Sequence, residues 1–287
     1  LLMSTGVFVS VSFPLILLLV SGCADDPAII DPGSQRQGSS RDFPRVDGEF
    51  VFPDASTYKG ELVDGKPNGF GQRRFLDGNV YEGDFLNGRQ NGEGTMLYRG
   101  DSALKRYDGA WAADKRHGNG ILEYADSSIK DGLWSNDSFE RGTLEDAEGA
   151  IYAGIWEGDV ITQGTARLPD GSSFTGSWEN GYYLDGTLIN PEGDRYTGTF
   201  RESFYDGSGS LEKQNGETYV GQFQEGEYHG VGRLEHMDGI FYVGQFQSGK
   251  PHGHGRQTDP SGVEYSGAWE RGERQGGGVL IFAEGGR

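Results

Sequence analysis

The stretch that decides the fold is residues 219–239, which read YVGQFQEGEYHGVGRLEHMDG. Successive side chains of a β-strand point to opposite faces, so Tyr219, Gly221 and Phe223 share one face. The Asp-Gly pair that ends at Gly239 supplies the positive φ that a tight reverse turn requires. The stretch therefore predicts one β-hairpin with aromatic rings and glycine on the same face.

The same pattern recurs along most of the chain. Each returning segment carries a glycine, and in most units an apolar side chain follows two positions later, as in Gly232 and Leu234. A fixed period of this kind is typical of architectures in which every unit packs on its neighbours. The first position recurs every 22 to 26 residues, at Tyr58, Tyr81, Tyr107, Lys130, Tyr152, Phe174, Tyr196, Tyr219, Tyr242 and Tyr265.

This pattern resembles the MORN repeat family, whose unit runs Tyr-x-Gly-x-Trp, a glycine-containing turn, Gly-x-Gly and Asp-Gly. The resemblance covers residues 47–287 and implies an all-β fold, an elongated single-layer stack of about ten β-hairpin repeats. The glycines support the same fold, because each leaves a hollow that a neighbouring aromatic ring can cover. Some family members join these repeats to a kinase or methyltransferase domain. Here the repeats run to the end of the sequence, so we expect no enzyme activity.

Three consecutive units, which begin at Lys130, Tyr152 and Phe174, depart from the pattern. Each is 22 residues long, and each lacks the first glycine of Gly-x-Gly. Bulkier side chains and shorter turns alter strand twist, so we expect a bend or an altered cross-section over residues 130–195. Simple decay of the repeat is the alternative. The aligned residues that replace the glycine are Glu140, Thr162 and Leu184.

The N-terminal segment resembles the leader of a bacterial lipoprotein. Residues 7–20 are mostly apolar, too short for a membrane span of about 20 residues and suited to a signal-peptide core. Residues 20–23, Val-Ser-Gly-Cys, resemble a lipobox, and the chain's only cysteine stands where lipid would be attached. We therefore predict a signal peptide over 1–22, lipidation of Cys23 and a flexible tether over 23–46. The alternatives are a secretory signal with an incidental cysteine and an uncleaved anchor.

Charge and the residue after the cysteine bear on location and partners. Ala24 stands where an Asp would resemble an inner-membrane retention signal, so we expect the outer membrane of a bacterial cell envelope. The net charge is −19, and no concentrated basic patch is visible. Such a surface repels nucleic-acid phosphates and anionic lipid headgroups. Nucleic acid is therefore excluded as a partner, and membrane contact is expected only through Cys23.

Two groups of residues are candidates for partner binding. Aromatic residues gather near the hairpin tips, along one edge of the predicted rod, where they would suit protein or sugar recognition. Structural packing of these rings is the alternative. The last strand is apolar on both faces, so its edge is expected to pair with a second copy or a partner, unless the terminus is tucked in. The tip residues are Phe139, Tyr182, Tyr183, Phe204, Tyr205 and Tyr228, and the edge residues are Val279, Leu280, Ile281 and Phe282.

The sequence offers no convincing catalytic or metal site. His117, His229 and His252 occupy the same position of their repeats, and adjacent copies would lie about 9–10 Å apart, too far to share one ion. The sole cysteine is assigned to lipidation, and no cofactor motif is present. We therefore predict a non-enzymatic, lipid-anchored scaffold for envelope proteins. The alternative is a glycan-binding module, with peptidoglycan as the ligand.

Overall fold

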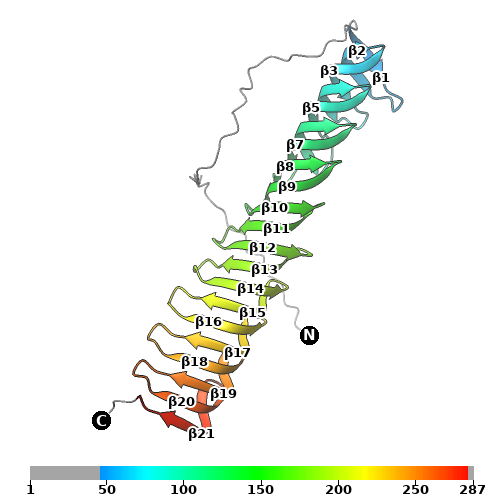
Figure 1. Ribbon diagram of the computed structural model, residues 1–287. Helices are drawn as coiled ribbons and strands as arrows, with labels where there is room; N and C mark the ends of the chain where they lie inside the picture. Colours follow the sequence, from blue (N-terminus) through cyan, green and yellow to red (C-terminus); the bar gives the residue numbers. More distant parts are fainter. Residues whose placement is uncertain (1–45, 284–287) are drawn as a thin grey trace, which may run out of the picture.

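The computed structural model describes residues 46–283, so the predicted signal peptide, Cys23 and nearly all of the tether lie outside the described residues. Twenty-one strands form a single sheet. Each strand pairs antiparallel with the strands before and after it in the sequence. Figure 1 shows them stacked along one long axis from β1 to β21. The expected all-β rod of hairpin repeats is confirmed.

Strand β1 precedes ten hairpins, which run from β2–β3 to β20–β21. The strands are β1 (Val46–Val51), β2 (Thr57–Val63), β3 (Lys66–Arg74), β4 (Val80–Leu86), β5 (Arg89–Leu97), β6 (Leu104–Ala112), β7 (Lys115–Tyr124), β8 (Ile129–Ser135), β9 (Ser138–Glu145), β10 (Ile151–Glu157), β11 (Val160–Arg167), β12 (Ser173–Glu179), β13 (Tyr182–Ile189), β14 (Arg195–Arg201), β15 (Phe204–Glu212), β16 (Thr218–Gln224), β17 (Glu227–Glu235), β18 (Phe241–Gln247), β19 (Lys250–Thr258), β20 (Glu264–Glu270) and β21 (Glu273–Ile281).

A column of glycines crosses the whole sheet, with one glycine from every strand. In β16 and β17, Gly221 pairs with Gly232, and the same glycine-to-glycine pairing continues to both ends of the rod. The ring of Tyr219 covers this pair, because a Cβ added at Gly232 would lie 2.3 Å from the Tyr219 hydroxyl oxygen. The tyrosine is fully buried as a result. Ring and glycine therefore form one packing unit, as the sequence pattern predicted.

A bulge next to the glycine explains the Gly-x-Gly motif. Gly221 pairs with Gly232, but the next residue, Gln222, pairs with His229, so two residues of β17 bulge out. The first of these, Gly230, has a φ of +56°, which favours glycine. The Tyr219 hydroxyl donates to the carbonyl oxygen of Gln222 at 2.9 Å, where the ladder is interrupted. The bulge therefore gives the buried hydroxyl its acceptor.

Seven repeats share this hydrogen bond. In each of them, the first tyrosine donates to the carbonyl three residues later. The tyrosines are Tyr58, Tyr81, Tyr107, Tyr196, Tyr219, Tyr242 and Tyr265. We call these units the tyrosine repeats and the three units over residues 130–195 the central repeats.

The central repeats differ from the tyrosine repeats in their bulge, over the residues where the sequence departs from the pattern. In β8 and β9, Gly132 pairs with Gly142 and Trp134 with Phe139, which leaves a bulge of one residue, Glu140, instead of two. The shorter bulge needs no residue in the left-handed region, so the first glycine of Gly-x-Gly is absent here. Lys130 replaces the tyrosine and is buried, with its Nζ 2.6 Å from a carboxylate oxygen of Asp159.

The aromatic core is also divided in the centre. Ring contacts run without a gap from Tyr58 to Trp156 and again from Phe174 to Trp269. Among the described residues, no ring contact joins Trp156 to Phe174. Ala166 is buried between them, and Tyr152 is only partly buried. The rod therefore consists of two aromatic stacks joined by a segment with smaller side chains.

Candidate binding surfaces

The six tip aromatics do not form one exposed stripe, contrary to the expectation. Phe139 and Tyr228 belong to the buried core, and Tyr183 and Tyr205 are partly buried against it. Tyr205 and Tyr228 stack face to face on the tyrosines of their repeats, with ring centres 3.8 and 3.9 Å apart. Phe139 and Tyr228 therefore offer no surface to a partner, and Tyr183 and Tyr205 offer only part of their rings.

Tyr182 and Phe204 behave differently, because each stands one residue before a partly buried ring and points to the other side. Tyr182 is 52% exposed and Phe204 is 61% exposed. They begin β13 and β15 and so lie at equivalent positions of successive hairpins. A binding role for aromatic tips stays a prediction for these two residues.

The last described strand, β21, has an unprotected edge in the described part of the chain. It pairs with β20 through Leu280, which faces Tyr265. Leu280 is 46% exposed and its neighbour Ile281 51% exposed, whereas Leu234, at the equivalent position two hairpins earlier, is 6% exposed. Val279 and Phe282 are exposed as well. Pairing of this edge with a second copy or a partner remains a prediction.

The histidines are spread along the rod. His229 and His252 each pair with a glutamine, Gln222 and Gln245, in successive hairpins. Over residues 46–283, no three His, Cys, Asp or Glu side chains come together to hold a metal ion.

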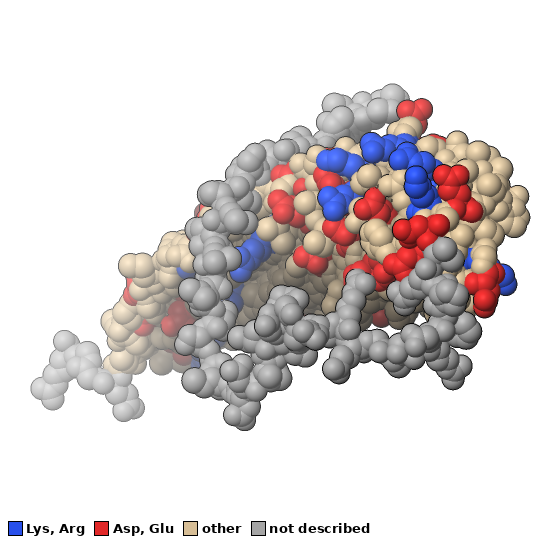
Figure 2. Space-filling view, turned by 90° about the horizontal axis from the view of Figure 1, so that it is seen from above, with Lys and Arg blue, Asp and Glu red and all other residues tan. Residues whose placement is uncertain are grey.

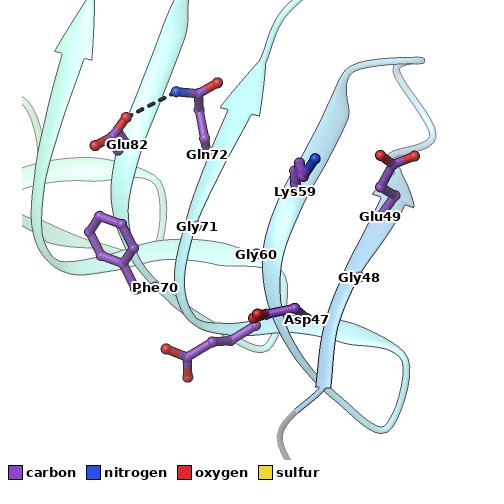
Figure 3. A pocket seen from close by; sticks show the side chains of 10 residues that line it. Asp47, Gly48, Glu49, Lys59, Gly60, Phe70, Gly71, Gln72 and Glu82 are labelled. Atoms are coloured by element: carbon purple, nitrogen blue, oxygen red, sulfur yellow. Dashed lines mark hydrogen bonds between the residues drawn. The ribbon is translucent and has the colours of Figure 1, made fainter.

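A groove on the face opposite the tyrosines was not predicted from the sequence. On β1 to β6, two rows of side chains flank the glycine column, and Figure 3 shows the part over the first strands, with Gly48, Gly60 and Gly71 between the rows. Two adjoining hollows of about 610 and 520 Å³ lie between the rows and share Phe70, Gln72 and Glu82. The first row is Glu49, Lys59, Gln72, Glu82, Thr95 and Asp108, and the second is Asp47, Glu61, Phe70, Asp84 and Glu93.

Carboxylates dominate this groove, which we call the acidic groove. Six of them line the two hollows, against two basic side chains, and Arg106 is already paired with Asp108 at 2.6 Å. Figure 2, seen from above, shows many acidic side chains at this end of the rod, beside a group of Lys and Arg side chains. Phe70 lies in the middle of the groove and is 48% exposed. The six carboxylates are those of Asp47, Glu49, Glu61, Glu82, Glu93 and Asp108.

The charge of the groove acts on the core on the other side of the sheet. Burial, reinforced by the carboxylates of Glu61 and Asp47, raises the pKa of Tyr58 to about 12. Burial first, and these carboxylates second, therefore extend to higher pH the range in which the Tyr58 hydroxyl stays protonated and donates to the carbonyl of Glu61 at 2.8 Å.

These features define an elongated all-β repeat protein, and the comparisons with known proteins identify its family. The model of the MORN repeat matches more than half of the chain, at residues 58–80, 81–102, 107–129, 196–218, 219–240, 242–264 and 265–287. The chain therefore belongs to the MORN repeat family. The seven matches are the seven tyrosine repeats, and the central repeats are unmatched.

The family assignment indicates a repeat scaffold for interaction with proteins or membranes. Over residues 46–283, no helix is long and apolar enough to span a membrane. No curated protein matches the sequence.

Two solved structures are similar by their chain traces. One is the G-box domain of the microcephaly protein CPAP, 12% identical, with a TM-score of 0.20 over 83% of this chain and 99% of that chain. The other is the Drosophila melanogaster SAS-4 (dCPAP) TCP domain in complex with a proline-rich motif of Ana2 (dSTIL), 11% identical, with a TM-score of 0.18 over 84% of this chain and 99% of that chain. TM-scores this low carry no information on the partners of the present chain.

Proposed function

We propose that this protein is a non-enzymatic scaffold, tethered by a lipid on Cys23 to the outer membrane of a bacterial cell envelope, where it holds other proteins. The open sheet of 21 strands carries the proposal. Most of its aromatic side chains pack between repeats, and the face opposite the tyrosines is left for partners. The lipobox-like residues 20–23 support the tether.

Cross-linking in the native envelope, followed by capture of the full chain, tests the scaffold. We expect a small, reproducible set of cross-linked proteins that is absent without cross-linker. Recovery of the chain alone, at every cross-linker length, would contradict the scaffold role.

Fractionation of a Cys23→Ser variant tests the tether separately. Without a thiol, no diacylglycerol can be attached, so the variant should leave the membrane fraction while the wild-type protein stays in it. A variant that still sediments with membranes would refute lipid anchoring and leave the scaffold role standing.

A glycan-binding module, with peptidoglycan as the ligand, is the second candidate. Tyr182 and Phe204 favour it, because their exposed rings repeat along one edge at two strand spacings, about 10 Å. Exposed aromatic rings suit the apolar faces of sugar rings. The lipid-free chain should then pellet with purified cell wall, and Tyr182→Ala with Phe204→Ala should release it. The control pair Val220→Ala and Val231→Ala removes exposed side chains elsewhere and should change nothing. Equal pelleting of all three proteins would exclude these rings as the site.

A further inference from the structure

We propose that the acidic groove binds an extended segment of a partner protein rich in lysine or arginine, with one apolar side chain of that segment packed on Phe70. The inference rests on the proposed scaffold role but does not depend on the lipid anchor. It is carried by the charge of the groove, by its length and by its contrast with the other end of the rod.

Charge complementarity identifies the class of partner. Apart from Arg106, which is paired with Asp108, Lys59 is the one basic side chain lining the two hollows. Glu49, Glu82 and Glu93 are exposed, so their charges face solvent. Carboxylates in this number attract ammonium and guanidinium groups and repel nucleic-acid phosphates and anionic lipids. No three of the described groups are placed to hold a metal ion, so a cationic side chain is the complementary ligand.

The shape of the groove favours an extended chain. Neighbouring strands lie about 4.8 Å apart, so six strands span roughly 25 Å, the length of seven or eight residues of extended chain. The two rows hold carboxylates along this whole length, from Asp47 on β1 to Asp108 on β6. A segment with basic residues at alternate positions can therefore meet several carboxylates at once.

Phe70 adds an apolar contact that charge alone does not explain. It precedes the column glycine of β3 and is the only aromatic residue at this position in any of the ten repeats. About half of its surface is exposed between charged rows, and this exposed half of the phenyl ring gains nothing from the fold. Burying this ring against an apolar side chain of the partner would contribute favourable free energy and fix the register of the bound segment.

The C-terminal repeats show that the repeat itself does not require an acidic face. The residues that flank the column glycines of β16 to β21 include no carboxylate. They are Val220, Gln222, Val231, Arg233, Val243, Gln245, His254, Arg256, Ser266, Ala268, Gly277 and Val279. The acidic groove is therefore a property of one end of the rod and not of the fold.

A peptide titration with the full-length protein in detergent tests the proposal. The probe is a fluorescein-labelled peptide of thirteen residues that alternates lysine and alanine and has one central leucine. We expect saturable binding that weakens as salt rises, because exposed charges are screened. The triple variant Glu49→Gln, Glu82→Gln and Glu93→Gln should bind about tenfold more weakly, given roughly 0.2–1 kcal/mol for each exposed ion pair.

Two controls keep the test decisive. The triple variant Glu140→Gln, Glu157→Gln and Glu179→Gln removes the same charge from exposed positions in the central repeats and should bind the peptide normally. Phe70→Ser should weaken binding of the peptide with the central leucine, but should not change binding of a second peptide that has serine in place of that leucine. Val231→Ser, at the equivalent position of a later repeat, should change the binding of neither peptide.

The proposal is overturned if the wild-type protein does not bind the lysine peptide, or if both triple variants lose binding equally. It is also overturned if a peptide with glutamate in place of lysine binds as well. Proteins cross-linked in the envelope would, in any of these cases, still support the scaffold role, so the two proposals fail separately.

Discussion

The tyrosine repeats and the central repeats have the same hairpin topology and the same glycine column, but different interiors. In a tyrosine repeat, one buried ring covers two glycines, and its hydroxyl bonds to a carbonyl freed by a two-residue bulge. In the central repeats, the bulge is one residue, that hydrogen bond is absent, and Lys130 or Tyr152 replaces a buried tyrosine ring. Ring, hydroxyl, bulge and glycine therefore change together. These four features form one packing unit. Because the central repeats lack the complete unit, we expect the centre to be the least stable part of the rod.

Alkaline titration should produce the largest effect, because it acts on several tyrosine repeats at once. Burial raises the pKa of Tyr58, Tyr219 and Tyr242 to about 12. The stability that depends on their protonated hydroxyls is fully present below the pKa of about 10 of an unfolded tyrosine and is lost as pH rises through about 12. Phenolate absorbance and loss of the β-sheet circular dichroism signal should therefore coincide in this window. If the phenolates of Tyr58, Tyr219 and Tyr242 form near pH 10 with the sheet intact, the burial of these rings is contradicted.

Replacing one ring by alanine should lower the free energy of unfolding more in a tyrosine repeat than in a central repeat. Tyr219→Ala should lower the free energy of unfolding by about 3–5 kcal/mol, because it removes a buried ring that stacks on Tyr228 and meets Phe223 and Phe246 edge to face. Tyr152→Ala, at the aligned central position, should cost about 1–2 kcal/mol, because that ring is only partly buried. Urea unfolding, monitored by tryptophan fluorescence, measures both values. Equal losses of unfolding free energy in the two variants would contradict the difference between tyrosine and central repeats.

Replacing the buried lysine should strengthen the centre. The Lys130 side chain is 5% exposed, while its partner Asp159 is 90% exposed, so the ion pair offsets little of the cost of burying the ammonium. The rings of Tyr124, Phe139 and Trp156 lie 5.4–5.9 Å from Nζ, and we expect their contribution to be smaller than that cost. Lys130→Met, which is unbranched and uncharged and one atom shorter than lysine, should raise the free energy of unfolding by about 1–2 kcal/mol in the same urea experiment. A destabilised Lys130→Met variant would show that the ion pair outweighs the cost of burying the charge.

Removal of a single hydroxyl should give the smallest difference. Tyr219→Phe loses the hydrogen bond to the carbonyl of Gln222 and should cost about 1 kcal/mol. Tyr152→Phe loses no hydrogen bond within the described part of the chain and should change the unfolding free energy by less than about 0.5 kcal/mol. If the two variants lose the same stability, the bulge carbonyl is not the acceptor that distinguishes the tyrosine repeats.

The sequence predicted the repeat, its hairpin and the role of glycine, because strand alternation and glycine spacing are local properties. It also located the departure at residues 130–195. It did not reveal the bulge, because a bulge is a relation between two strands, and only the register of Gly221 with Gly232 makes it visible.

The candidate surfaces were only partly predictable. Tyr182 and Tyr183 are adjacent, and alternation alone separates an exposed ring from a partly buried one once the strand is known. The residues that flank each glycine in the sequence include the carboxylates of the acidic groove, but Asp47 and Asp108 are far apart in the sequence. The pairing of six strands brings their rows together, and that register is set by the bulges.

The central claim is tested most directly by hydrogen exchange of the backbone amides in the intact chain at neutral pH. The exchange rate is measured for one peptide after another along the chain. Amides of β8 to β13 are predicted to exchange before those of β2 to β7 and β14 to β19, because the centre lacks the tyrosine unit and its aromatic stack is interrupted. A uniform exchange rate along the rod, or a centre that exchanges last, would contradict the account.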